Sequence, residues 1–185
     1  LGNSSAFGKA LYELHQLGLI DRMPRLAIIQ AEGANPLYRA YLTEFEVYEP
    51  VHADTLATAI KIGNPVNYRK AVRALEWTNG VVEQVTDQET MDAKALIDGI
   101  GIGCEPASAC TLAGIRKLRN NGIMGERETV VGILTGHILK DPDATIAYHA
   151  NTLDGIHAAS PNRIIDAEPT LEALAAILGS QPVAH

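Results

Sequence analysis

The spacing of apolar residues at the start of the chain predicts a helix. Phe7, Leu11 and Leu14 recur at the three- to four-residue interval that places them on one helical face. Residues 3–5 are all of types that favour a helix N-cap, and Gly18 is typical of a helix end. We therefore expect a helix between these two signals.

Short apolar runs further along predict strands. Residues 25–33, "RLAIIQAEG", form a continuous apolar run that ends in glycine, as buried strands of parallel sheets do. Residues 81–87 alternate in the manner of a strand, and residues 129–135, "TVVGILT", are the most strongly apolar run. Residues 162–166 predict a last strand at a sheet edge.

Helical patterns separate these runs. The expected helices are one from Pro36, one from an Asn67 cap to about Leu75, one capped by Asp87 and ending at Gly99, one from about Pro106 to Leu118, and a short amphipathic one within 168–178. Residues 43–54 predict an irregular acidic loop, and after Pro142 we expect the chain to loosen. Strands that alternate with helices predict an α/β fold with a mainly parallel sheet and flanking helices. Ligands of such sheets lie at the carboxyl ends of the strands.

Composition narrows the class of protein. The 185 residues suit one domain, or one domain and a tail, and the net charge of −7 argues against nucleic acid and anionic membranes as partners. The two cysteines are spaced neither as a zinc knuckle nor as a redox pair, which favours a reducing, cytoplasmic compartment. The sequence begins within a motif and without Met, so we interpret it as part of a longer protein.

Two places offer groups for ligand binding. The opening Gly2-Asn3-Ser4 precedes a helix, where free N–H groups and a positive dipole end could hold a phosphate, although the same residues also serve as a plain N-cap. Thr135 ends the apolar run 129–135. Its hydroxyl could meet a heterocycle nitrogen without placing a full charge there, or it could bond within a turn.

Other candidates are weaker. Gly99, Gly101 and Gly103 are spaced in twos and do not match a dinucleotide fingerprint. We interpret Cys104 as a buried thiol rather than a nucleophile, and His137 either lines a pocket or holds a turn. The histidines do not show metal-ligand spacing, so no metal is expected. The lysines fall mostly in polar helical surroundings, which gives no evidence for a Schiff base.

Four stretches together resemble the threonine synthase family of pyridoxal-phosphate enzymes. They are "GNSSAFGKA", "TLATAIKIGNPVN", "GIGCEPASA" and above all "TGHILKDP", and they occur in the family's order. The family shares the fold of the tryptophan synthase β chain, termed fold type II. The resemblance implies that residues 1–142 are part of the large domain that binds pyridoxal 5'-phosphate and that residues 143–185 form a C-terminal extension packing on it.

The resemblance also implies roles for individual residues. It implies that Leu1, Gly2 and Asn3 contact the cofactor phosphate. Ile62 and Gly63 would lie near the cofactor ring, and Thr135 would bond the pyridine nitrogen. A hydroxyl does not hold that nitrogen protonated, so the electron sink is milder and protein groups must steer which bond breaks. The Schiff-base lysine, the first half of the phosphate loop and most substrate-binding groups are expected upstream, so no catalytic residue is assigned here.

The function implied is conversion of O-phospho-L-homoserine and water to L-threonine and phosphate. The alternatives are a related pyridoxal-phosphate enzyme, such as threonine dehydratase or cysteate synthase, and a non-catalytic α/β binding module. Without the lysine we expect the isolated chain to be inactive. We also expect it to associate with the missing N-terminal part of the enzyme or with itself, as a homodimer, because a partial domain exposes apolar faces.

Overall fold

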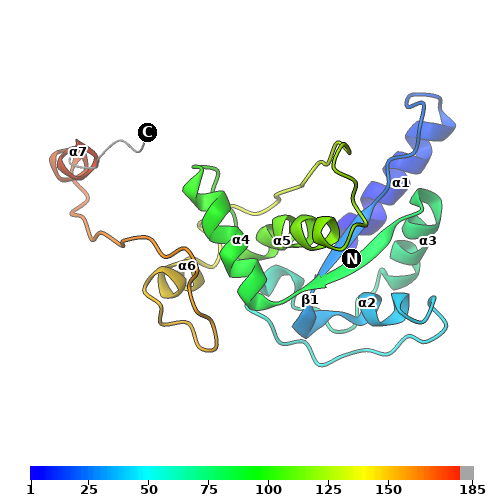
Figure 1. Cartoon of the computed structure of the whole chain (residues 1–185), viewed down its shortest axis with the longest axis horizontal. Helices are drawn as coiled ribbons and strands as arrows, with labels where there is room; N and C mark the ends of the chain where they lie inside the picture. Colours follow the sequence, from blue (N-terminus) through cyan, green and yellow to red (C-terminus); the bar gives the residue numbers. More distant parts are fainter. Residues whose placement is uncertain (180–185) are drawn as a thin grey trace.

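The computed structural model describes residues 1–179 as an α/β fold built on two parallel strands (Figure 1). Strand β1 (Ala27–Ala31) pairs with β2 (Val81–Val85) in parallel, with Ala27 opposite Val81. Between the two strands the chain passes through helices and returns to the end of the sheet at which β1 begins, as a parallel connection requires. The predicted α/β class with a parallel sheet and flanking helices is confirmed.

Helices make up most of the remaining regular structure. They are α1 (Gly2–Gln16), η1 (Glu32–Ala34), α2 (Pro36–Tyr41), η2 (Thr58–Ile60), α3 (Tyr68–Thr78), α4 (Asp87–Gly99), α5 (Pro106–Asn120), α6 (Pro142–His149) and α7 (Leu171–Gly179). The predicted first helix is confirmed as α1, but the N-cap expected among residues 3–5 was wrong, because α1 begins at Gly2 and its N-cap is Leu1, without a side-chain cap bond. The helix ends because Gly18 adopts a positive φ of 67° and Leu19 N–H bonds back to Leu14 O at 2.9 Å.

The two faces of the sheet carry different clusters of apolar side chains. Ile28 and Val82 are paired in register and pack against α2 and α3 through Leu37, Ala71 and Leu75. On the other face, Val85 packs against Ala93 of α4 and against Cys110 and Ala113 of α5. Because successive strand residues point to opposite faces, one short strand pair supports both layers.

Helix α4 begins with a complete capping box. Thr86 Oγ1 accepts from Glu89 N–H at 3.1 Å, and Glu89 Oε2 accepts from Thr86 N–H at 2.7 Å. The cap is therefore Thr86, and the prediction of Asp87 in that role was wrong by one residue. The Asp87 carboxylate accepts instead from the Thr55 hydroxyl and from Leu56 N–H, at 2.5 and 3.0 Å, which fixes the chain that precedes η2.

The two later strand predictions were wrong. Residues 129–135 are extended but irregular, and they run along α5, where the Thr111 hydroxyl donates to Ile133 O at 3.2 Å. Within residues 1–179 no strand lies beside them to complete a hydrogen-bonded ladder, and a strand exists only with such a partner. Residues 162–166 are likewise irregular and exposed for the same reason.

The chain does not loosen directly after Pro142, contrary to expectation, because Pro142 opens α6. Tyr148 of α6 is buried against Met91 and Ala95 of α4, and its hydroxyl donates to Asp92 Oδ1 at 2.6 Å. Helix α7 has no buried residue and stands apart from the other elements in Figure 1. The end of the predicted C-terminal extension, residues 180–185, lies outside the described residues.

Over residues 1–179, none of the helices combines the length and the apolar character that crossing a membrane requires.

Candidate functional site

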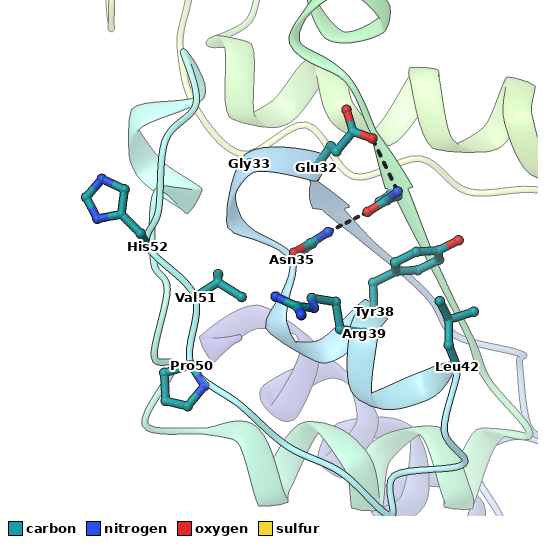
Figure 2. Close-up of a pocket in the computed structure, with 10 residues that line it drawn as sticks. Glu32, Gly33, Asn35, Tyr38, Arg39, Leu42, Pro50, Val51 and His52 are labelled. Carbon is teal, nitrogen blue, oxygen red and sulfur yellow. Dashed lines mark hydrogen bonds between the residues drawn. The ribbon is translucent and has the colours of Figure 1, made fainter.

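Two neighbouring hollows lie where β1 and β2 end. The first hollow has a volume of about 670 Å³ and is lined by Glu32, Gly33, Asn35, Tyr38, Arg39, Leu42, Pro50, Val51, His52 and Gln84 (Figure 2). The second hollow, of about 550 Å³, shares Glu32 and Gly33 and is bounded on another side by residues 154–156 of the C-terminal extension. Both open at the carboxyl ends of parallel strands, the usual ligand position in such folds.

A chain of polar side chains crosses the floor of the first hollow. The Asn35 amide donates to Gln84 Oε1 at 2.6 Å, and the Gln84 amide donates to Glu32 Oε1 at 3.5 Å. Figure 2 shows the Arg39 side chain extending from α2 toward Val51 on the opposite wall. The hollow therefore presents a guanidinium and a carboxylate at different places on its wall.

The segment 51–54 forms one wall and is clamped between two glycines. Val51 N–H donates to Gly63 O at 3.0 Å, and Asp54 N–H donates to Gly33 O at 2.8 Å. A Cβ on Gly63 would lie 1.8 Å from Val51 O, and one on Gly33 would lie 1.6 Å from Asp54 O. Larger residues are excluded at both positions, which explains glycine in the "KIGNP" motif. Gly63 thus adjoins the first hollow through Val51, whereas the side chain of Ile62 is exposed.

Lys61, the first residue of this motif, places a positive charge at the rim of the second hollow. Its Nζ lies 2.9 Å from Asp54 Oδ1, and both side chains are substantially exposed. The hydrogen bond from Lys61, followed by its positive charge, holds the pKa of Asp54 below the usual value of 3.8. Asp54 therefore stays ionised in weak acid.

The beginning of α1 has the donors that a phosphate needs. Ser5 N–H bonds to Leu1 O at 3.2 Å, whereas the amides of Gly2, Asn3 and Ser4 belong to the first turn, where a helix supplies no acceptor. Gly2 and Asn3 are exposed, and a Cβ on Gly2 would meet nothing within 4 Å. Space and free N–H groups are both available there, as anion binding at a helix N-terminus requires.

Thr135 lies against the first turn of α5. Its backbone N–H and that of Gly136 both donate to Ser108 Oγ, at 3.0 and 2.9 Å, and the hydroxyl oxygens of Thr135 and Ser108 lie 3.2 Å apart. Ser108 is buried and Thr135 is exposed. The contact joins residues 27 positions apart, so no local pattern in the sequence could indicate it.

The segment after Thr135 is fastened at two further points. Lys140 Nζ lies 2.7 Å from Oε2 of Glu105, which is buried, and the hydrogen bond and negative charge of Glu105 raise the pKa of Lys140. The Thr58 hydroxyl donates to Asp141 Oδ2 at 2.6 Å. These contacts bring "TGHILKDP" onto "CEPASA" and onto η2 of "TLATAIKIG", so three of the four motifs meet in space.

The fourth motif lies elsewhere. Leu1 packs against the cluster that contains Ile28 and Val82, whereas Thr135 is held by α5, which covers the opposite face of the sheet. The six residues predicted to contact a cofactor line neither hollow. Within residues 1–179 the segment after Thr135 meets the motif at 55–67 through Asp141 and Thr58, whereas Leu1–Asn3 lie apart, and the assignment of all six residues stays a prediction.

The cysteines have the character of buried thiols. Burial raises the pKa of both Cys104 and Cys110 to about 11, and both are free. A thiol with so high a pKa is not ionised near neutral pH and is a poor nucleophile. The residues that the structure describes also contain no cluster of side chains suited to a metal ion.

Comparison with known proteins matches this chain to one family and to several similar proteins. The family model described as "Pyridoxal-phosphate dependent enzyme" matches residues 1–136. Threonine synthase of Methanosarcina acetivorans is 46% identical over 147 residues, which cover 78% of this chain and 36% of that protein. Threonine synthase 2, chloroplastic, of Arabidopsis thaliana is 43% identical over 155 residues, covering 83% of this chain and 30% of that protein.

Two further matches are another threonine synthase and one solved structure. Threonine synthase of Mycobacterium tuberculosis is 41% identical over 78% of this chain and 39% of its own length. A solved structure of T.th. threonine deaminase aligns with a TM-score of 0.46 at 16% identity, over 67% of this chain and 48% of that one. The chain spans about a third of the length of the three relatives named here. Since the family model matches well over half of the sequence, the chain belongs to the family of pyridoxal-phosphate dependent enzymes.

Proposed function

We propose that this chain is the C-terminal part of a threonine synthase, which converts O-phospho-L-homoserine and water to L-threonine and phosphate. The observation that carries the proposal is the 41–46% identity to proteins named threonine synthase over about four fifths of the chain. The motif "TGHILKDP" and its packing against "CEPASA" support the same conclusion. The substrate is then a small phosphorylated amino acid.

Donor groups that suit the phosphate and the ring nitrogen of pyridoxal phosphate lie at two separate places in this chain. The first turn of α1 offers free amides to the phosphate, and Thr135 offers a neutral hydroxyl to the pyridine nitrogen. When bound, the cofactor supplies an electron-withdrawing ring to the substrate's amino carbon. We infer that in the whole enzyme this chain supplies a contact to the cofactor phosphate and the hydrogen bond to its ring nitrogen.

We do not assign the Schiff-base lysine of the proposed enzyme to this chain. Among the lysines in the described part of the chain, Lys94 alone is fully buried, and its ammonium lies 2.5 Å from Asp98 Oδ2. The ion pair occupies this ammonium and Lys94 lines neither hollow, whereas imine formation needs an accessible free amine. We infer that the lysine lies in the part of the enzyme that this chain does not span, together with the groups that bind the substrate phosphate.

The test is phosphate release from O-phospho-L-homoserine by the isolated chain in the presence of pyridoxal phosphate. We expect no turnover above the rate without protein, because the lysine amine is absent. Turnover near that of the Methanosarcina acetivorans enzyme, measured side by side, would contradict the assignment of the chain as a C-terminal part.

We further propose that the chain associates, either with the N-terminal part of the same enzyme or with a second copy as a homodimer. Large apolar side chains are exposed along 129–139 and on α7, including Val131 at 81%, Leu139 at 75% and Leu171 at 79%. Exposed apolar surface of this kind marks interaction sites in soluble proteins. A sizing experiment that finds a monodisperse monomer would contradict the proposal.

The free, buried cysteines favour a reducing compartment, which we take to be the cytoplasm.

A further inference from the structure

We propose that Ser108 is a positioning residue that fixes the proton of the Thr135 hydroxyl, so that Thr135 donates, rather than accepts, toward the ring nitrogen of the cofactor. The inference rests on the proposed function for its ligand. The arrangement of the two hydroxyls is a property of the chain itself and is argued from its contacts alone.

Ser108 has a full complement of hydrogen-bond partners. Its Oγ accepts from Thr135 N–H at 3.0 Å and from Gly136 N–H at 2.9 Å. A serine hydroxyl has two acceptor lone pairs and one proton, so the two amides use both lone pairs. The remaining partner of Ser108 Oγ is Thr135 Oγ1 at 3.2 Å, and geometry alone permits either oxygen to be the donor.

The count of lone pairs decides between the two. Thr135 cannot donate to an oxygen whose lone pairs are already occupied, so the proton between the two oxygens belongs to Ser108. Thr135 Oγ1 therefore accepts from Ser108, and its own proton is left to point away from α5. Thr135 is exposed, and its hydroxyl has this single partner among the described residues, so the proton is free for a ligand.

The surrounding contacts keep this arrangement in place. Ser108 is 3% exposed in the first turn of α5, so water does not compete for its proton. Glu105 N–H donates to Gly136 O at 3.1 Å, and a Cβ on Gly136 would displace the side chain of Glu105. The backbone of residues 135–136 is thus held from both sides, while Thr135 as a whole stays exposed.

The chemical consequence concerns the protonation of the ring nitrogen. A hydroxyl fixed as a donor favours a nitrogen with a free lone pair and opposes its protonation. A hydroxyl free to rotate could also accept from a protonated nitrogen. Ser108 therefore selects the neutral ring, and its removal should raise the pKa of the ring nitrogen even where the cofactor remains bound.

The first experiment tests the arrangement in the chain without cofactor. The proton on Ser108 Oγ should exchange slowly enough to be resolved by the deuterium isotope shift on its Cβ, whereas that of Thr135 should not. In Ser108→Ala, amide exchange at Thr135 and Gly136 should accelerate at least about ten-fold, and Ser108→Thr should restore protection. Thr111→Val is the matched control, because it removes another α5 bond to the same segment, at Ile133, without touching Thr135.

The second experiment uses a chimera in which the matching 147 residues of the Methanosarcina acetivorans enzyme are replaced by those of this chain, loaded with pyridoxal phosphate ¹⁵N-labelled in the ring. The ring-nitrogen shift, titrated with pH, should report an unprotonated nitrogen in the parent chimera and in Ser108→Thr. It should show protonation at higher pH in Ser108→Ala, with affinity for the cofactor about three- to ten-fold weaker. Thr111→Val should match the parent chimera.

The outcomes separate the two proposals. Two results would overturn the role of Ser108 and leave the proposed function standing. One is slow exchange of the Thr135 hydroxyl proton, and the other is a ring-nitrogen titration in Ser108→Ala that coincides with the one in Thr111→Val. A parent chimera that folds but binds no pyridoxal phosphate would overturn the proposed function and the ligand named here. Slow exchange at Ser108 together with the shifted titration supports both.

Discussion

The contact between α1 and α3 sets the position of the proposed phosphate site, and Gly8 makes that contact possible. A Cβ on Gly8 would lie 2.2 Å from Ala74 Cβ and 2.9 Å from Ala74 Cα. Ordinary contact begins near 3.4 Å, so Gly8→Ala requires the helices to separate by about 1.2 Å, the difference between 3.4 and 2.2 Å. The obstacle includes backbone, which cannot rotate out of the way.

The change in the free energy of unfolding caused by Gly8→Ala is the difference between two opposing effects. Overpacking a close contact costs about 1–3 kcal/mol, and the rigid obstacle favours the upper end. Alanine gains up to about 1 kcal/mol over glycine in helix propensity. We expect a net loss of about 1–2 kcal/mol in the free energy of unfolding, which for a chain of this size lowers the Tm by roughly 2–8 °C.

The assay has a built-in reporter, because Trp77 is the single tryptophan and its ring stacks on Tyr12 across this contact at 4.3 Å. Urea unfolding followed by its fluorescence gives the stability, and its native emission reports the helix separation. Gly2→Ala is the control within α1, since its Cβ meets nothing within 4 Å. Ala74→Gly added to Gly8→Ala should recover at least part of the loss. A Gly8→Ala chain as stable as the parent, with unchanged emission, would refute the reasoning.

Three further predictions follow from single contacts. Thr86→Ala removes the cap of α4 and should lower the free energy of unfolding by about 1 kcal/mol in urea titrations, and an unchanged midpoint would contradict the capping box. Lys61→Met should raise the pKa of Asp54 toward 3.8 in an NMR titration of its carboxyl. Because the folded pKa is lowered, the stabilisation from this pair is present above pH 3.8 and is lost as pH falls through the folded pKa. Native Cys104 and Cys110 should react slowly with iodoacetamide at about pH 8 and quickly in guanidinium chloride, because burial raises both pKa values to about 11; rapid native labelling would disprove their burial.

Local signals in the sequence predicted local structure well. Gly18 lies just beyond the end of α1 and the turn at 63–65 precedes α3, because helix ends and turns depend on a few adjacent residues, whereas the N-cap expected at 3–5 was wrong, since these residues lie within α1. The strand predicted at 129–135 failed for a different reason. Apolar character indicates that a segment is suited to burial, whereas a strand also needs a neighbouring backbone, which the described chain does not supply.

The candidate site was predictable only in part. Thr135 was identified by its place at the end of an apolar run and by resemblance, but its partner Ser108 lies 27 residues away, and a hydrogen bond at that separation leaves no periodicity. The same holds for the bond from Thr58 to Asp141, across 83 residues. Helix α6 was missed although Pro142 gave the N1 signal, because its buried Tyr148 is a single anchor rather than an apolar stripe.

Phosphate release by the Methanosarcina acetivorans chimera tests the proposal that this chain forms the cofactor-binding C-terminal part of a threonine synthase. We predict that the chimera releases phosphate from O-phospho-L-homoserine with stoichiometric formation of L-threonine, and that Thr135→Val strongly reduces this rate. A folded chimera that binds pyridoxal phosphate but forms no threonine, or that instead consumes added threonine, would contradict the account.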